Sequence, residues 1–318
     1  MRLGLHLLFL ALLGSCSMVS KVAVKTTGSV ISNGSDELLE EANWEHFKNA
    51  APANLKMIEG LWFSDQENKE LLTLLIKGYG AYGFGVAETQ ALENILLESE
   101  QVFLTQQAVM FYQKAIYYGE KYLALKGIKS EEFWDKNFPE KLEKVFNENI
   151  DTEDYVALFY FAQSLGSSIN IQRQNLSQMA KMNHALKTMN WVCAKAPHIE
   201  RDGCSLYEAI MAASLPSIMG GDQAQAKAKF LKIIKERPYD LLAHESYIQY
   251  QLLPMMDEEE LAKEMKILED KLSIWYYLQL GDEKDGSLIY REHRNYNLYN
   301  AIANVRFHII KKNIKKLL

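Results

Sequence analysis

The stretch that decides the fold covers residues 68–85 and reads NKELLTLLIKGYGAYGFG. Its glycines have the G-x-G-x-x-G spacing of loops that bind the pyrophosphate of a dinucleotide, at Gly78, Gly80 and Gly83. Such a loop needs a buried strand before it and a helix that starts within it. The apolar residues before the glycines recur instead at helical spacing, at Leu71, Leu72, Leu75 and Ile76. The context therefore favours a helix over a nucleotide-binding loop.

The helical pattern continues through the glycines. Steps of four, three and four place one set of residues on a common face: Leu75, Tyr79, Tyr82 and Val86. An adjacent stripe is mostly small, so that a neighbouring backbone can approach closely: Ile76, Gly80, Gly83 and Ala87. Ser64 and Glu67 form an S-x-x-E capping box, which predicts that the helix starts there. The tyrosines either pack in a core or line a cavity, and the sequence leaves both interpretations open.

The amino terminus reads MRLGLHLLFLALLGSC, in which the apolar run is too short to span a bilayer. Its end, at residues 13–16, resembles the lipobox of bacterial lipoproteins, which implies cleavage before Cys16 and lipidation of that cysteine. An ordinary secretory signal is the alternative. Ser17 after the cysteine resembles outer-membrane sorting in Gram-negative bacteria. We predict a signal peptide at 1–15, a lipidated flexible tether at 16–35, and a folded domain at 36–318 that faces the periplasm.

The charge balance argues against a nucleic-acid partner. The 318 residues include 35 basic and 41 acidic side chains, for a net charge of −6. The one basic cluster is KKNIKKLL at 311–318, where lysines suit the end of a helix because they complement its dipole. Binding of nucleic acid requires a basic patch or stripe, so we expect no nucleic-acid partner.

Cys193 and Cys204 are the two cysteines that remain after the predicted lipidation site. An exported protein permits a disulfide between them, and two buried thiols are the alternative. His198 lies between the cysteines, but the spacing matches no zinc pattern and a fourth ligand is missing. We therefore expect neither a metal nor another cofactor.

Helical periodicity recurs almost throughout the chain, with only six prolines and no convincing strand pattern. Residues 220–250 follow the logic of a tetratricopeptide unit. Ala226 is a small residue suited to a helix crossing, Phe230 and Ile233 follow on the same face, and residues 238–240 start the next helix. We predict an all-α single domain of degenerate, tetratricopeptide-like helical hairpins.

Several blocks of the sequence together resemble the T-component family of TRAP-type transporters, which are periplasmic lipoproteins. The blocks cover residues 50–85, 111–125, 155–170, 207–243 and 298–312. The fourth is the most specific, through Pro216, the run Gly220-Gly221-Asp222, Phe230 and Pro238. Gln66 and Phe161 depart from the family pattern without affecting the expected fold.

The resemblance implies a helical domain without catalytic activity that works with a periplasmic substrate-binding protein of the TRAP class. It also implies a small organic or apolar ligand, and membrane attachment through the lipid anchor; self-association is left open. We expect a ligand passage or groove at Tyr79, Tyr82, Tyr207, Pro216, Ile218, Met219, Gly220 and Gly221. For the loop SLPSIMGG within this set, an insertion that only reshapes packing is the alternative.

Two other functions remain as alternatives. A helical-repeat lipoprotein that assembles envelope machinery would share the fold and differ only in its partner. A cell-wall hydrolase is disfavoured, because His244-Glu245 begins an H-E-x-x-H zinc motif that fails at Ile248. The sequence also has no G-x-S-x-G motif.

Overall fold

A computed structural model of the chain describes residues 23–99, 102–135, 138–146 and 150–318. Within these ranges it contains helices and turns and no strand, which confirms the all-α prediction. The longer helices are α2 (Trp44–Ser64), α3 (Lys69–Tyr82), α4 (Thr89–Leu96), α5 (Val102–Leu125), α7 (Phe138–Phe146), α8 (Thr152–Ile171), α10 (Met182–Lys195), α11 (Ile199–Ser214), α12 (Gln223–Glu236), α15 (Glu258–Gln279) and α17 (Asn297–Leu317).

Short helical elements connect these helices. The α-helical ones are α6 (Ser130–Phe133), α9 (Leu176–Met179), α13 (Leu241–Tyr247), α14 (Leu253–Met255) and α16 (Leu288–Glu292). Three are 3-10 turns, η1 (Ser35–Glu40), η3 (Ser217–Met219) and η5 (Arg294–Tyr296). Two are π-helical, η2 (Gly83–Glu88) and η4 (Ile248–Leu252).

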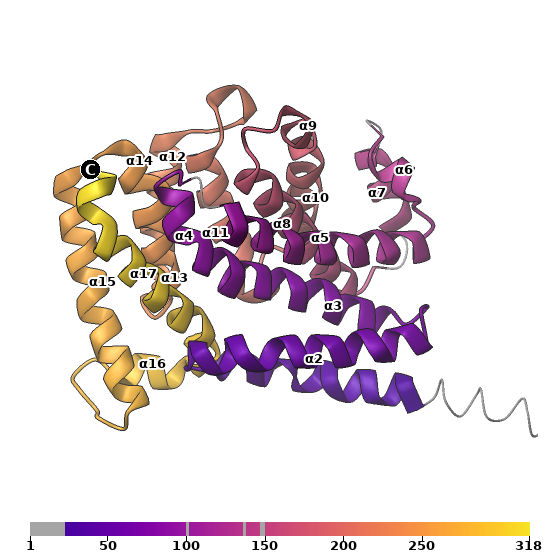
Figure 1. Ribbon diagram of the computed structural model, residues 1–318, viewed down its shortest axis with the longest axis horizontal. Coiled ribbons are helices and arrows are strands. Elements are labelled where there is room, and N and C mark those ends of the chain that lie inside the picture. Colours follow the sequence, from indigo (N-terminus) through magenta and orange to yellow (C-terminus); the bar gives the residue numbers. More distant parts are fainter. Residues whose placement is uncertain (1–22, 100–101, 136–137, 147–149) are drawn as a thin grey trace, which may run out of the picture.

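Successive helices pack as antiparallel hairpins (Figure 1). Helix α3 packs on α2, α5 and α8, and α8 packs in turn on α5 and α10. Helix α11 pairs with α12 in the hairpin that the repeat pattern predicts. Ala226, Phe230 and Ile233 are all buried there, and Asp240 caps the next helix as expected.

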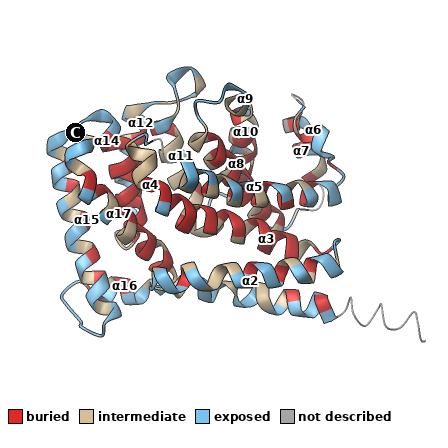
Figure 2. Ribbon diagram, in the orientation of Figure 1, coloured by how far each residue is buried: buried red, intermediate tan, exposed pale blue. Residues whose placement is uncertain are grey.

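The last helix closes the array into a ring. Helix α17 packs on α13 and also returns to α2 and α4 near the start of the chain. Around the ring the helices follow the order α2, α3, α8, α11, α13 and α17. Each helix contacts the next one in this order, and α17 contacts α2. The buried residues follow this arrangement, because they gather on α3, α8 and α13 while α2 and α15 expose their outer faces (Figure 2).

The glycines of the quoted stretch lie at helix crossings. A Cβ atom on Gly80 would lie 2.7 Å from the hydroxyl oxygen of Ser164 in α8. A Cβ on Gly83 would lie 2.8 Å from the ring of Tyr112 in α5. A Cβ on Gly85 would lie 2.8 Å from Ile302 in α17. The segment is helical, as predicted, because α3 continues directly into η2. Its glycines allow three neighbouring helices to approach closely.

Two local predictions are wrong. The cap of α3 is Asn68, whose side chain accepts from the backbone N–H of Leu71, and Ser64 belongs to the end of α2. Residues 23–34, which lie in the expected flexible tether, form a helix that continues into η1. This helix runs beside α2 in Figure 1, and its Val24 and Gly28 are buried. Cys16 and the predicted signal peptide lie outside the described residues.

The stretch SLPSIMGG forms the loop between α11 and α12, as expected. Gly220 adopts a left-handed conformation with φ of 98°, which favours glycine. A Cβ on Gly221 would lie 1.7 Å from the carbonyl oxygen of Leu215, so this position excludes larger residues. The N–H of Asp222 then donates to Ala212 at 2.8 Å and closes the loop.

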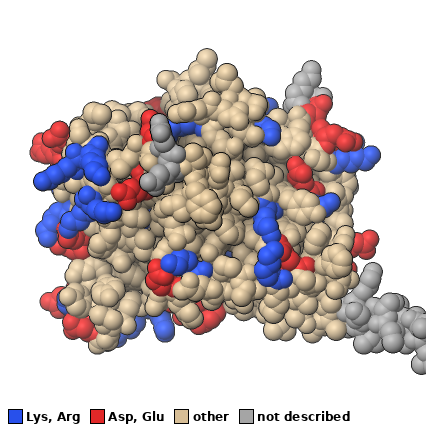
Figure 3. Space-filling view, in the orientation of Figure 1, with Lys and Arg blue, Asp and Glu red and all other residues tan. Residues whose placement is uncertain are grey.

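Among the described helices, none combines the length and the apolar character needed to cross a membrane. In the space-filling view, charged side chains gather toward the margins of the face shown, and its centre is largely uncharged (Figure 3).

Candidate functional site

The ring of helices encloses a cavity of about 680 Å³. This volume lies within the range of small-molecule sites, roughly 300–1,000 Å³. Every helix of the ring contributes to the wall, and representative lining residues are Leu55 (α2), Leu74 (α3), Phe159 (α8), Ile210 (α11), Leu242 (α13) and Ile302 (α17). The cavity is therefore a product of ring closure and has mainly apolar walls.

Helix α3 forms its part of the wall with small side chains. Gly78 and Ala81 face the cavity one turn apart, and Phe84 follows in η2. A Cβ on Gly78 would lie 2.5 Å from the side chain of Leu55 in α2. The small-residue pattern therefore serves two purposes, close helix packing on one side and open space on the other.

The helix at residues 23–34 and η1 also line the cavity. Ile31 and Gly34 contribute from the helix, and Leu38 and Leu39 contribute from η1. An ion pair with a separation of 3.5 Å links Asp36 of η1 to Arg201. Part of the segment expected to be a tether is thus one side of the site.

Where α3, α8 and α11 meet, a cluster of three polar side chains interrupts the apolar wall of the cavity. We call Lys77, Tyr160 and Glu200 the polar group. The ammonium of Lys77 lies 3.1 Å from the carboxylate of Glu200. The hydroxyl of Tyr160 donates to the same carboxylate at 2.8 Å. Burial, together with the nearby charge of Glu200, raises the pKa of Tyr160 well above its ordinary value. Tyr160 therefore stays protonated and acts as a donor.

Glu200 belongs to a strained turn at the start of α11. Glu200, Arg201 and Asp202 have positive φ values of 46°, 57° and 59°. Left-handed backbone costs about 1–2 kcal/mol for each non-glycine residue. Arg237 compensates by donating to the carbonyls of Arg201 at 3.2 Å and Asp202 at 3.3 Å, and the hydroxyl of Tyr296 donates to Arg201 at 3.2 Å. All three turn residues line the cavity.

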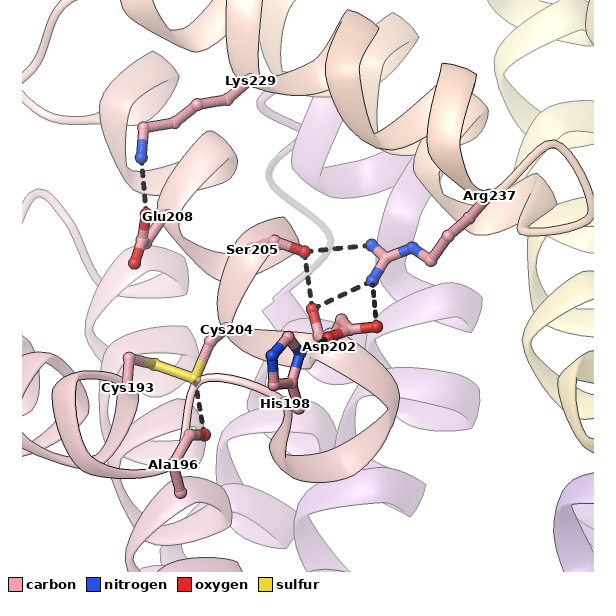
Figure 4. The surroundings of a disulfide bond; sticks show 9 residues. All are labelled: Cys193, Ala196, His198, Asp202, Cys204, Ser205, Glu208, Lys229 and Arg237. Carbon is pink, nitrogen blue, oxygen red and sulfur yellow. Dashed lines mark hydrogen bonds and ion pairs between the residues drawn. A yellow bond between two sulfur atoms is a disulfide. The ribbon is translucent and has the colours of Figure 1, made fainter.

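A disulfide between Cys193 of α10 and Cys204 of α11 encloses the same turn (Figure 4). The sequence left open whether these cysteines form a disulfide or remain two buried thiols, and the structure shows the disulfide. Both sulfur atoms are used by this bond, so neither is left as a thiolate ligand for a metal. In the described part of the chain, no group of three His, Cys, Asp or Glu side chains is placed to hold a metal ion.

Two of the predicted passage residues line the cavity, Tyr207 of α11 and Pro216 of the following loop. The other six do not: Tyr79, Tyr82, Ile218, Met219, Gly220 and Gly221. The two tyrosines of α3 point away from the cavity, because the hydroxyl of Tyr79 donates to Glu59 of α2 and that of Tyr82 donates to the carbonyl of Lys48.

The loop residues lie outside the cavity, close to where it reaches the ends of α8 and α11. Lining residues near that end are Asn170 in the last turn of α8, Arg173 shortly after it, Met179 of α9, and Leu215 and Pro216 after α11. Beside them, Leu176 is 84% exposed and Ile218 is 96% exposed. Both are large apolar side chains left in solvent, as are others elsewhere on the surface, such as Phe63 and Met110.

Sequence reasoning missed the polar group of Lys77, Tyr160 and Glu200. Lys77 directly precedes the glycine stretch, and a single lysine in an apolar helix face was the available signal. Glu200 had none, because nothing in the sequence IERDG indicates three consecutive left-handed residues.

Together these features define a helical-hairpin protein that encloses an apolar cavity within a closed ring. A family model described as the TRAP transporter T-component matches residues 40–269. The chain belongs to this family. Among the curated proteins compared with the chain, none matches it.

Proposed function

We propose that this T-component is a non-enzymatic accessory protein that docks a periplasmic substrate-binding protein of the TRAP class and accommodates its small organic ligand. The observation that carries the proposal is the 680 Å³ apolar cavity enclosed by the ring of helices. A cavity of this kind can receive a ligand without any further chemistry. Family membership supports the link to a TRAP system.

The proposed docking surface is the end of the molecule where the cavity reaches α9 and the loop after α11. Leu176 of α9 and Ile218 of the loop provide exposed apolar side chains, and they lie close in the chain to the lining residues Met179 and Pro216. A binding protein seated there would bring its ligand to the cavity. Loops on a rigid helical scaffold commonly carry such contacts.

We also propose that Cys16 is lipidated and holds the protein at the outer membrane, facing the periplasm. The support is the sequence at residues 13–16. Because residues 23–34 pack against the domain, little chain remains between the anchor and the cavity wall. Intact-mass analysis of membrane-extracted protein should show acylated Cys16, and an unacylated mature chain would contradict this part of the proposal.

The docking proposal is tested with the detergent-solubilised full chain and a TRAP-class binding protein from the same genome, by calorimetry. Ile218→Lys places a charge in the proposed contact and should weaken binding at least about tenfold, the size of a truncated interface anchor. Phe63→Lys is the matched control, because Phe63 is an exposed apolar residue at the carboxyl end of α2, outside the proposed docking surface.

Equal affinities of the two variants, with wild-type helicity by circular dichroism, would remove the loop from the docking surface. Absence of binding by the wild type to every TRAP-class binding protein of that genome would overturn the transport role. Co-purification with envelope-assembly proteins instead would favour the assembly function.

A further inference from the structure

The cavity is lined by equal numbers of basic and acidic side chains. Four are basic and four are acidic: Lys77, Arg173, Arg201 and Arg237, and Glu88, Glu200, Asp202 and Asp240. Their formal charges therefore cancel. A site that selects a charged ligand would instead carry an excess of the opposite charge.

Each of these side chains also has a partner of opposite charge. Lys77 pairs with Glu200 at 3.1 Å, and Arg237 lies 3.5 Å from both Asp202 and Asp240. The three remaining pairs are Arg173 with Glu98 at 2.6 Å, Arg201 with Asp36 at 3.5 Å, and Arg306 with Glu88 at 3.5 Å. Arg237 is shared by Asp202 and Asp240, and Arg306 is shared by Glu88 and Glu245, so the lining leaves no cation without an anionic partner.

The polar atoms of the lining that lack a hydrogen-bond partner are mostly neutral. They belong to Gln163, Tyr207 and Ser246, and to the Nε atoms of Arg201 and Arg237, whose guanidinium groups are already ion-paired. Neutral donors and acceptors of this kind suit hydroxyl, carbonyl or amide groups. The rest of the wall is apolar side chain.

We propose that the cavity takes an uncharged, mostly apolar molecule that carries hydroxyl, carbonyl or amide groups, and that it excludes organic anions. A carboxylate entering the cavity would add a charge with no free counter-charge, and burial of an unpaired ion is strongly unfavourable. The inference rests on the proposed function, because it assumes that the transported ligand occupies this cavity.

The test compares three probes with the same apolar chain and different head groups, 1-decanol, decanoate and decylammonium, by calorimetry at pH 7.4 on the full chain. Decanol should bind the wild type at least about tenfold more tightly than either ion, since a tenfold ratio needs only 1.4 kcal/mol of head-group discrimination. Decanoate binding that equals or exceeds decanol binding would overturn the proposal.

Paired variants then test whether charge balance is the cause. Glu200→Gln leaves Lys77 without its partner, so decanoate should gain affinity about tenfold and decylammonium should not. Lys77→Gln leaves Glu200 unpaired and should favour decylammonium instead. Unchanged preferences in both folded variants would contradict the proposal, and either variant alone suffices if the other fails to fold.

A cavity-filling variant confirms the location. Ala81 lines the cavity from α3, so Ala81→Trp should abolish decanol binding while the circular dichroism spectrum is retained. Decanol binding that persists in this variant would place the probe elsewhere and overturn the assignment. Docking of the binding protein is measured separately with Ile218→Lys. Failure of the docking proposal and failure of the head-group preference are therefore distinguishable, because each experiment can succeed when the other fails.

Discussion

Gly80 sets how closely α3 approaches α8. Beyond Ser164, a Cβ at this position would lie 3.6 Å from the backbone carbonyl oxygen of Tyr160. A glycine weakens a helix by about 1 kcal/mol relative to alanine, and the close contact with α8 offsets that loss. The sequence pattern predicted this helix because its periodicity continues through the glycines.

We expect Gly80→Leu to lower the free energy of unfolding by about 1–3 kcal/mol, because the added side chain must displace α8. Gly60→Leu is the matched control, since Gly60 is an exposed helical glycine with no atom near its Cβ position. That control should be neutral or slightly stabilising, as leucine has the higher helix propensity. Urea unfolding measures both variants, and equal stabilities would contradict the role of Gly80 as a contact point.

The faces of α3 show where residue-scale prediction ends. Periodicity correctly grouped Tyr79 with Tyr82, but it could not say which neighbour covers that face. The structure turns the tyrosines toward α2 and α5 and turns Gly78 and Ala81 toward the cavity. Assigning tyrosines to a passage relied on their chemistry, whereas the open space follows from the small residues beside them.

At the scale of elements, Glu59 joins three helices. Its carboxylate on α2 accepts from Tyr79 of α3 at 2.6 Å, from Tyr118 of α5 at 2.9 Å, and from the ammonium groups of Lys114 and Lys56. Burial acts to raise the pKa of Glu59, but these hydrogen bonds outweigh it and lower the pKa to about 2. The ionised form is thus the one that holds the helices together.

This pKa predicts an acid-sensitive contact. The pKa of Glu59 in the folded state is about 2, which lies below its ordinary value of 4.5. Between these two pH values the unfolded state therefore binds more protons than the folded state. The stabilisation is present above pH 4.5 and is lost as the pH falls toward 2. Glu59→Gln should therefore be less stable than wild type at pH 7, with the difference shrinking by pH 3 in urea unfolding experiments. Glu45→Gln, on the exposed side of α2, is the control, and a difference independent of pH would contradict this account.

The helix at residues 23–34 could not be predicted from its own residues. The segment AVKTTGSVISNG is rich in Gly, Ser, Thr and Val, which are poor helix formers. Its helix depends on packing, since a Cβ on Gly28 would lie 3.2 Å from the side chain of Leu71. Tertiary contacts of this kind override local preference, and a single sequence does not reveal them.

At the scale of the whole molecule, hairpins between adjacent helices could be predicted and ring closure could not. The α11–α12 hairpin depends on residues close in sequence, such as Ala226 and Phe230. Contact of α17 with α4 and with α2 joins segments that are about 200 and about 250 residues apart. Because that contact creates the cavity, the class of fold was accessible from sequence while the main feature of the site was not.

Arg306 of α17 is the buried charge at this closure. Its guanidinium donates to Glu245 at 3.2 Å, to Gln249 at 2.6 Å and to Thr89 at 3.3 Å, and it lies 3.5 Å from Glu88. These partners come from α13, η4, α4 and η2. Neither Arg306 nor Glu245 has any exposed side-chain surface. The network therefore connects both ends of the ring.

We expect Arg306→Met to lower the free energy of unfolding by about 3–5 kcal/mol at pH 8, because it leaves two buried carboxylates without their cation. Burial already raises the pKa of Glu245, and Arg306 opposes that effect. Without Arg306, the folded-state pKa of this carboxyl rises further above its unfolded value. A raised folded pKa gives stability that is present at low pH and lost as the pH increases.

The loss in Arg306→Met should consequently be smaller at pH 5 than at pH 8, measured by urea unfolding of both proteins at each pH. Adding Glu245→Gln removes one of the two uncompensated charges, so the double variant should recover part of the stability at pH 8 and show a weaker pH dependence. If the single variant stays within about 1 kcal/mol of wild type, below the cost expected for a broken buried pair, the closure does not depend on this network. In that case the apolar contacts of α17 with α13 and α4 are sufficient to close the ring around the cavity.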